Sequence, residues 1–98
     1  MIEFATAALD DLERIFDFNR DAFDEPFALR QLRQIRSAVT VLDEHPYIGR
    51  PIPRSELREL VVRTTRQSGF IVLYSYDEFE GLIRVVAVRH QRERLSQR

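Results

Sequence analysis

Hydrophobic residues in the first quarter of the chain recur every three or four positions and are separated mainly by charged residues. The apolar positions are Leu9, Leu12, Ile15, Phe16, Phe18 and Phe23. This spacing predicts an amphipathic helix, because residues three and four apart share one helical face. Thr6 suits the N-cap position, so we expect the helix to begin there and to end between Ala22 and Asp24. Residues 1–5 alternate weakly and predict a short strand before it.

A second helical stripe follows Pro26, a residue that the first turn of a helix tolerates. Its apolar positions are Leu29, Leu32, Ile35, Val39 and Leu42, and Arg30, Arg33 and Arg36 lie among its polar positions. The pair His45-Pro46 ends it. Because the connection at residues 24–26 is short, we expect the two helices to form an antiparallel hairpin.

The pattern changes after the second helix. Residues 45–56 hold three of the four prolines, and they predict a long ordered loop of the kind that often carries function. Beyond it, β-branched and aromatic residues alternate with period two and predict three strands, at Leu57–Thr65, Phe70–Asp77 and Leu82–His90. The turns between them are short, so the strands form an antiparallel meander.

This order of elements predicts the fold class. A strand, two helices and three strands give a single α+β domain over residues 1–98, with the helical hairpin packed on one face of a mainly antiparallel sheet. A short basic tail follows at about residues 91–98. The opposite face of the sheet must be covered by something else or be functional.

Composition excludes several classes of protein. No apolar run approaches the roughly 20 residues of a membrane span, and the N-terminus has no signal-peptide pattern, so we expect a cytoplasmic protein without a membrane partner. The chain has no cysteine, which excludes disulfides, thiolate nucleophiles and zinc–thiolate sites. Its two histidines lack a suitable carboxylate spacing, so we expect neither a metal nor another cofactor.

The net charge of −1 conceals an asymmetry. Residues 1–49 carry five arginines and ten acidic residues, a net charge of −5, whereas residues 50–98 carry ten arginines and six acidic residues, a net charge of +4. A basic half of this kind suits a polyanion or an acidic protein. Every cation is arginine, which suits planar recognition of phosphate or carboxylate groups but is also what a GC-rich genome produces.

Five segments, in this order, resemble the RelE/ParE superfamily of bacterial toxins. They are the helix opening at 8–15 with its acidic pair, the loop at 42–51 with the sequence His-Pro-Tyr-Ile-Gly-Arg-Pro, the segment Leu57-Arg58-Glu59-Leu60, the strand at 70–77, and residues 86–92 ending in Arg-His-Gln-Arg. The resemblance implies a RelE/ParE-like β-α-α-β-β-β fold. It also implies the toxin of a type II toxin–antitoxin module, neutralised by a cognate antitoxin.

The resemblance leaves three functions open. A ParE-like toxin inhibits DNA gyrase by protein contact, and a RelE-like toxin cleaves messenger RNA on the ribosome without a metal. A degenerate member only binds its antitoxin and helps to repress their operon. The overall acidic charge and the absence of a lysine-rich basic set favour the gyrase inhibitor.

The ribonuclease alternative requires catalytic side chains, and the candidates are Arg58, Arg63, Arg84 and His90. Arginines can stabilise a phosphate in the transition state, and a histidine can act as general base. By strand alternation, Arg84 and His90 share one face, whereas Arg58 and Arg63 point to opposite faces. Two of the candidates also have a structural interpretation, because Arg58 can pair with an acidic residue of the hairpin and His90 can bond backbone.

Two further surfaces are predicted. Tyr74, Arg89 and Arg92 are candidates for binding the target, although Tyr74 also suits a half-buried aromatic face of the sheet. The side of the first helix that carries Ile15, Phe18 and Ala22 is the candidate antitoxin surface, because its apolar width exceeds what one sheet face needs to cover.

Overall fold

The computed structural model describes residues 1–91, and it contains two α-helices and five strands in that range. The elements are β1 (Ile2–Phe4), α1 (Thr6–Ala22), α2 (Glu25–Thr40), the short 3-10 helix η1 (Val41–Asp43), β2 (Arg50–Pro51), β3 (Leu57–Arg63), β4 (Gly69–Asp77) and β5 (Leu82–His90). The predicted helices and strands are confirmed to within a few residues. The two-residue strand β2 was not predicted, and most of the predicted tail lies outside the described residues.

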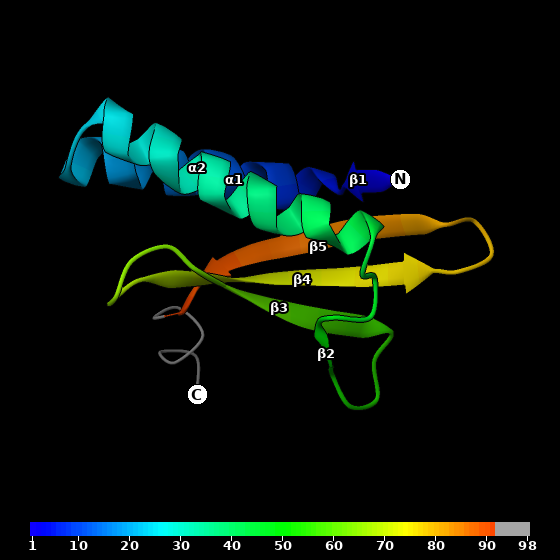
Figure 1. The fold of residues 1–98 in the computed structure, drawn as a ribbon. Coiled ribbons are helices and arrows are strands. Elements are labelled where there is room, and N and C mark those ends of the chain that lie inside the picture. Colours follow the sequence, from blue (N-terminus) through cyan, green and yellow to red (C-terminus); the bar gives the residue numbers. More distant parts are fainter. Residues whose placement is uncertain (92–98) are drawn as a thin grey trace.

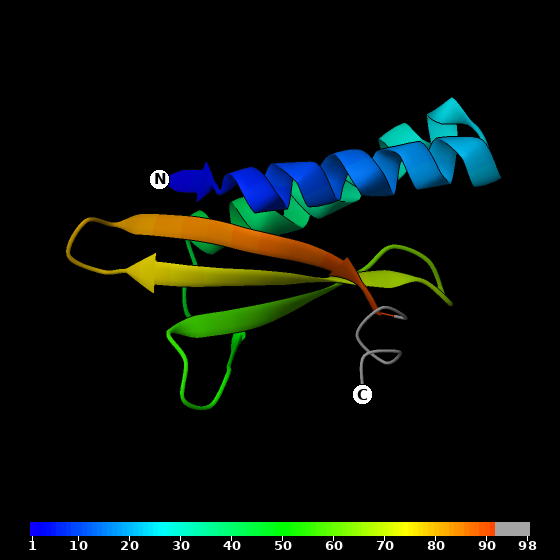
Figure 2. The same ribbon diagram turned by 180° about the vertical axis from the view of Figure 1, so that it is seen from behind.

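The five strands form one sheet in the order β1-β5-β4-β3-β2. The predicted meander β3-β4-β5 is antiparallel, whereas β1 pairs in parallel with β5. Figures 1 and 2 show α1 and α2 side by side over the same face of the sheet. The opposite face carries no helix in residues 1–91. The fold is therefore α+β in two layers.

Different signals begin the two helices. Ahead of α2, the carboxylate Oδ1 of Asp24 accepts a hydrogen bond from the backbone N–H of Phe27 at 2.8 Å, and Pro26 lies in the first turn as predicted. In α1 the expected N-cap, Thr6, is instead the first helical residue, and Ala5 occupies the cap position without a side-chain hydrogen bond. Pairing of β1 with β5 fixes the entry to α1, because the backbone N–H of Ala5 donates to the carbonyl of Val85 at 2.9 Å.

The main core lies between the hairpin and the sheet. Its largest fully buried side chains are Tyr74, Ile35, Leu42, Ile83, Val39, Val72, Val85 and Val88. On α1 the buried positions are Ala8, Ile15 and Asn19, whereas Leu9 and Phe23 of the predicted stripe are largely exposed. The apolar surface of α1 is thus wider than the strip that the sheet covers. In the described part of the chain, neither helix is long and apolar enough to cross a bilayer.

A β-bulge interrupts the pairing of β4 with β5. Leu73 lies opposite Ala87 and Tyr74 lies opposite Val85, which leaves Val86 without a partner in the register. Because side chains alternate along a strand, one extra residue exchanges the two faces from that point onward. This exchange decides the positions of the functional candidates at the end of β5.

Candidate functional site

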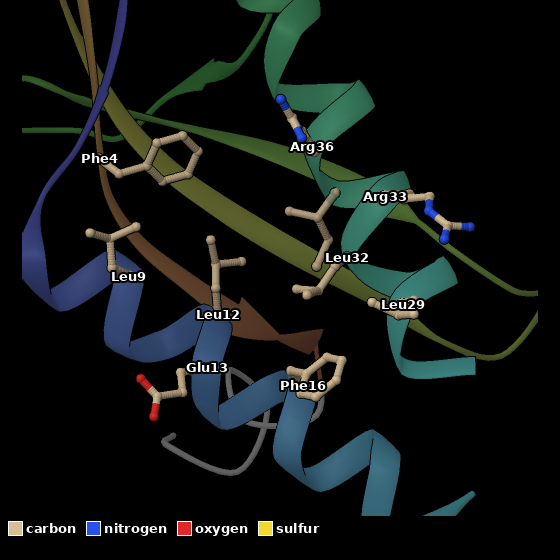
Figure 3. A pocket seen from close by; sticks show the side chains of 10 residues that line it. Phe4, Leu9, Leu12, Glu13, Phe16, Leu29, Leu32, Arg33 and Arg36 are labelled. Atoms are coloured by element: carbon tan, nitrogen blue, oxygen red, sulfur yellow. The ribbon is translucent and has the colours of Figure 1, made fainter. Parts of the chain in front are cut away.

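An apolar groove of about 700 Å³ lies between α1 and α2. Its apolar lining consists of Phe4, Leu9, Leu12, Phe16, Leu29, Leu32 and Ile35, and Glu13, Arg33 and Arg36 add the polar groups. Figure 3 shows side chains from β1 and both helices around one shared space, with the two arginines on the α2 side and Glu13 on the α1 side. Leu9 is 52% exposed although it belongs to the stripe predicted to be buried. The groove is therefore mainly apolar and open to the surface between the two helices.

The predicted antitoxin surface differs from this groove. Ile15 is 5% exposed and packs in the main core, so the prediction that it lies on an outer surface is wrong. Phe18 is 67% exposed and Ala22 is exposed, but neither lines the groove. The orientation of α1 about its axis explains the difference. Ala8 and Ile15 face the core, and Leu9 therefore faces outward.

The loop after η1 is held by two side chains of the sheet. The guanidinium Nη1 of Arg58 donates hydrogen bonds to the carbonyl oxygens of Tyr47 and Gly49, at 3.1 and 2.8 Å, and its Cζ lies 5.0 Å from the centre of the Tyr47 ring. Tyr74 donates from its hydroxyl to the carbonyl of Pro46 at 2.8 Å and accepts from the N–H of Gly49 at 2.8 Å. Arg58 therefore has a structural role.

Position 49 of this loop requires glycine. A Cβ at that position would lie 2.6 Å from the hydroxyl oxygen of Tyr74. The next residue, Arg50, forms an ion pair with Glu59 across the β2–β3 pair. The sequence His-Pro-Tyr-Ile-Gly-Arg thus encodes a strapped loop, and Tyr74 is its anchor. Tyr74 is 0% exposed, so the prediction that it binds a target by stacking is wrong.

The structure does not bring the four catalytic candidates together. Arg58 and His90 lie opposite Tyr74 and Phe70, on the face that carries the helices. Arg63 and Arg84 lie opposite Gly69 and Ser75, on the other face, which we call the open face because neither α1 nor α2 covers it. The prediction that Arg84 and His90 share one face is wrong because of the bulge at Val86. The prediction that Arg58 and Arg63 point to opposite faces is confirmed.

His90 and Arg84 have local contacts of their own. The ring of His90 packs edge-on against Phe70 with centroids 5.3 Å apart, and its Nε2 lies 3.2 Å from the hydroxyl of Ser68. Arg84 forms an ion pair with Glu3 of β1 at 2.8 Å. Among residues 1–91 no three histidine or acidic side chains gather closely enough to hold a metal ion.

The open face of the sheet gathers arginines that sequence alternation had separated. Arg89 lies opposite Ile71 and therefore shares this face with Arg63 and Arg84, and its Nε is buried without a hydrogen-bond partner in the described structure. The bulge is what brings Arg84 and Arg89 to the same side. Arg92, the third predicted target-binding residue, lies outside the described residues.

The chain matches one protein family in sequence and several solved structures in fold. Residues 2–95 match the family described as the ParE toxin of the type II toxin–antitoxin system, parDE. The chromosomal ParDE toxin–antitoxin system of P. aeruginosa contains a chain with 20% identity and a TM-score of 0.73, over 90% of this chain and 91% of that one. No curated protein sequence matches the chain significantly.

Two RelBE complexes also resemble it. The intact RelBE toxin–antitoxin complex of E. coli has a chain with 15% identity and a TM-score of 0.62, over 91% of this chain and 93% of that one. In the RelBE2 complex of Mycobacterium tuberculosis the values are 20% and 0.61, over 93% and 96%. At these identities the likeness concerns the fold, and it confirms the predicted RelE/ParE-like arrangement of a hairpin on a mainly antiparallel sheet.

Proposed function

The chain belongs to the ParE toxin family of type II toxin–antitoxin systems, and we propose that it inhibits DNA gyrase by direct protein contact until a cognate antitoxin covers it. The proposal places the protein in the cytoplasm, where gyrase acts. The observation that carries it is the dispersal of the four candidate catalytic residues over both faces of the sheet.

Dispersal favours a toxin without its own chemistry. General acid–base catalysis needs the base within hydrogen-bond reach of the reacting proton, and a phosphate clamp needs cations on the same side of the substrate. Here Arg58 is engaged by two loop carbonyls, and the bulge directs Arg84 away from His90. A contact with a protein target requires no such convergence.

The groove between α1 and α2 suits the antitoxin. Antitoxin segments that fold on binding insert apolar side chains into a groove, and this groove offers seven apolar side chains from three elements. Arg33 and Arg36 lie on its α2 side, so an amphipathic helix with acidic residues beside its apolar stripe is the occupant that we propose. The likeness to chains from toxin–antitoxin complexes supports the existence of such a partner.

The open face supports a second candidate function. It collects Arg63, Arg84 and Arg89, and a surface with several arginines can hold an RNA backbone. This arrangement keeps a RelE-like activity on the ribosome as the alternative, with the basic face rather than His90 as its centre.

Induction of the chain in a bacterium separates these functions. We expect growth arrest with a DNA-damage response and accumulation of gyrase–DNA cleavage complexes, all suppressed by co-expression of the antitoxin. Rapid arrest of translation with messenger RNA cut at the ribosome would establish the alternative. Antitoxin binding without any effect on growth would identify a non-toxic co-repressor. In His90→Ala we expect unchanged toxicity, a result that would exclude His90 as a catalytic base.

A further inference from the structure

A second hollow, of about 570 Å³, lies at the end of the sheet where β4 turns into β5. It is lined by Tyr47, Glu56, Ser75, Tyr76, Asp77, Glu78, Phe79, Leu82 and Arg84. We call it the turn hollow. Figure 1 shows the β4–β5 turn at the end of the molecule opposite the α1–α2 connection. The turn hollow shares no lining residue with the groove between α1 and α2, so both can be occupied at once.

The walls of the turn hollow are held in place before any partner arrives. The carboxylate Oδ1 of Asp77 accepts hydrogen bonds from the backbone N–H groups of Phe79 and Glu80, at 3.0 and 3.2 Å, and fixes the turn. Gly81 closes the turn with a φ of +64°, a conformation that glycine adopts without strain. A preformed wall lowers the entropy cost of binding.

Aromatic side chains make up one side of the turn hollow. The rings of Tyr47 and Tyr76 are in edge-to-face contact with centroids 5.2 Å apart, and the hydroxyl of Tyr47 donates to Glu78 at 2.6 Å. Phe79 is 95% exposed at the tip of the fixed turn. A phenylalanine held in water on a rigid turn contributes nothing to the core, whereas aromatic side chains are enriched at the centres of protein interfaces.

The charges of the turn hollow select the partner. Glu56, Asp77 and Glu78 contribute three carboxylates, and Glu56 has no ion pair within the described structure. The opposing cation in the lining, Arg84, is already paired with Glu3. Arg58 lies over Tyr47 and is bound by loop carbonyls. The excess of carboxylates beside aromatic rings attracts a cation and repels phosphate.

The hydrogen bond between Tyr47 and Glu78 also reports this charge. The pKa of the Tyr47 phenol is raised above its usual range, and the main cause is its hydrogen bond to Glu78. Burial of the phenol and the negative charge of Glu78 raise this pKa further. Arg58 acts in the opposite direction but does not cancel the effect.

We propose that the turn hollow receives an arginine or lysine side chain of a partner protein. The cation enters between the carboxylates of Glu56 and Glu78, and its apolar stem packs against Phe79. The chemistry is that of a basic protein segment and not of a nucleic acid, because three carboxylates are among the lining groups. This surface is separate from the antitoxin groove proposed above.

A titration followed by NMR tests the proposal. The ¹⁵N-labelled full-length chain, freed from its antitoxin and refolded, is titrated with acetyl-Gly-Arg-Gly-Arg-Gly-amide and, in parallel, with the peptide in which glutamate replaces both arginines. We expect saturable shift changes at Tyr47 and residues 76–82 with the arginine peptide and none with the glutamate peptide.

Four variants sharpen the result, and three of them are isosteric replacements of glutamate by glutamine. Glu56→Gln and Glu78→Gln each remove one carboxylate from the lining while keeping its shape, and we expect binding to weaken about two- to fivefold in each. Phe79→Ala removes the aromatic tip, with a loss of similar size. Glu80→Gln removes the same charge from the same turn but lies outside the lining, so binding should not change.

Three outcomes would overturn the proposal. The first is shift changes that do not saturate or that fall outside the turn hollow. The second is an equal response to the glutamate peptide, and the third is an equal loss in Glu80→Gln, which would reveal a general attraction to the acidic turn. The measurement uses neither gyrase nor antitoxin, so its failure is distinguishable from failure of the proposed function.

Discussion

The carboxylate of Asp11 in α1 accepts a hydrogen bond from the backbone N–H of Val88 in β5, at 2.9 Å. β1 pairs with β5 only as far as Val85, so in the described structure the rest of this sheet edge has no neighbouring strand. Asp11 therefore takes the place of a strand partner just beyond the bulge. It joins the acidic pair in the helix opening to the point where β5 changes faces, and it accepts from a donor on an unpaired edge, the kind of edge that favours pairing with another chain.

Replacement of Asp11 by alanine should therefore destabilise the fold. Val88 is fully buried, and its N–H would lose its acceptor, which costs about 1–3 kcal/mol of the free energy of unfolding. Asp11→Asn keeps an acceptor oxygen and should lose less. Asp10→Ala, next to it on the exposed surface, is the matched control and should change stability by less than about 0.5 kcal/mol. Denaturant unfolding of the purified chain measures all three, and equal losses for Asp10→Ala and Asp11→Ala would exclude this role.

Removal of the Tyr74 hydroxyl should loosen the strapped loop without opening a cavity. Tyr74→Phe keeps the buried ring but leaves the N–H of Gly49 without an acceptor and the carbonyl of Pro46 without a donor, so we expect a loss of about 1–3 kcal/mol. Faster amide exchange at residues 45–50 should accompany it. Tyr76→Phe removes a hydroxyl from the same face of the same strand, two residues along, and provides the comparison.

If both variants were equally stable, the hydroxyl of Tyr74 would have no structural role. The anchoring role described above would then be wrong.

The fold was predictable because its signals are periodic. Two helical stripes, three alternating strands and short turns determine a hairpin on a meander, and the observed ends of β5 match the predicted ones. The parallel pairing of β1 was not predictable, because three residues carry too little pattern to select a partner strand. β2 was missed for the same reason, since Arg50 and Pro51 read as loop.

The positions of the site residues were less predictable than the strands that carry them. Alternation assigns Arg84 and His90 to one face unless a bulge intervenes, and nothing in the run Val85 to Val88 marks where an extra residue is absorbed. The groove did leave a signal. The two helical stripes hold more apolar residues than one sheet face can cover, and Leu9 and Leu29 are among those left exposed. The stripes alone do not tell which of their residues face outward.

Titration of Tyr47 should be displaced toward high pH, since its pKa is raised chiefly by the hydrogen bond to Glu78. Because the pKa is raised in the folded state, this contact stabilises the fold fully below about pH 10. That stabilisation is lost as the pH rises through the pKa of the folded state. In Glu78→Gln the phenol should ionise at lower pH, nearer its ordinary value. Ultraviolet absorbance of the phenolate follows this change.

Comparison with Glu80→Gln separates the hydrogen bond from the general charge of the turn. An equal displacement in both variants would assign the effect to long-range charge. In Tyr47→Phe the displaced transition should disappear, which identifies the residue that produces it.

Charge placed in the groove between α1 and α2 should release the antitoxin. Leu9 lies in the groove and is half exposed, so Leu9→Glu can be accommodated by the fold while it places a carboxylate in the apolar contact. Substitution of a central interface residue costs about 2 kcal/mol or more of binding free energy, so we expect affinity for the antitoxin to fall at least about 30-fold. Phe18→Glu makes the same kind of change at a more exposed position of α1 outside the groove, and it should reduce affinity less than about threefold. Calorimetric titration with the antitoxin measures both, and thermal unfolding confirms that each variant is folded. If Phe18→Glu were the damaging variant, the antitoxin would bind the side of α1 that carries Phe18 and Ala22, and the groove would lose its proposed occupant.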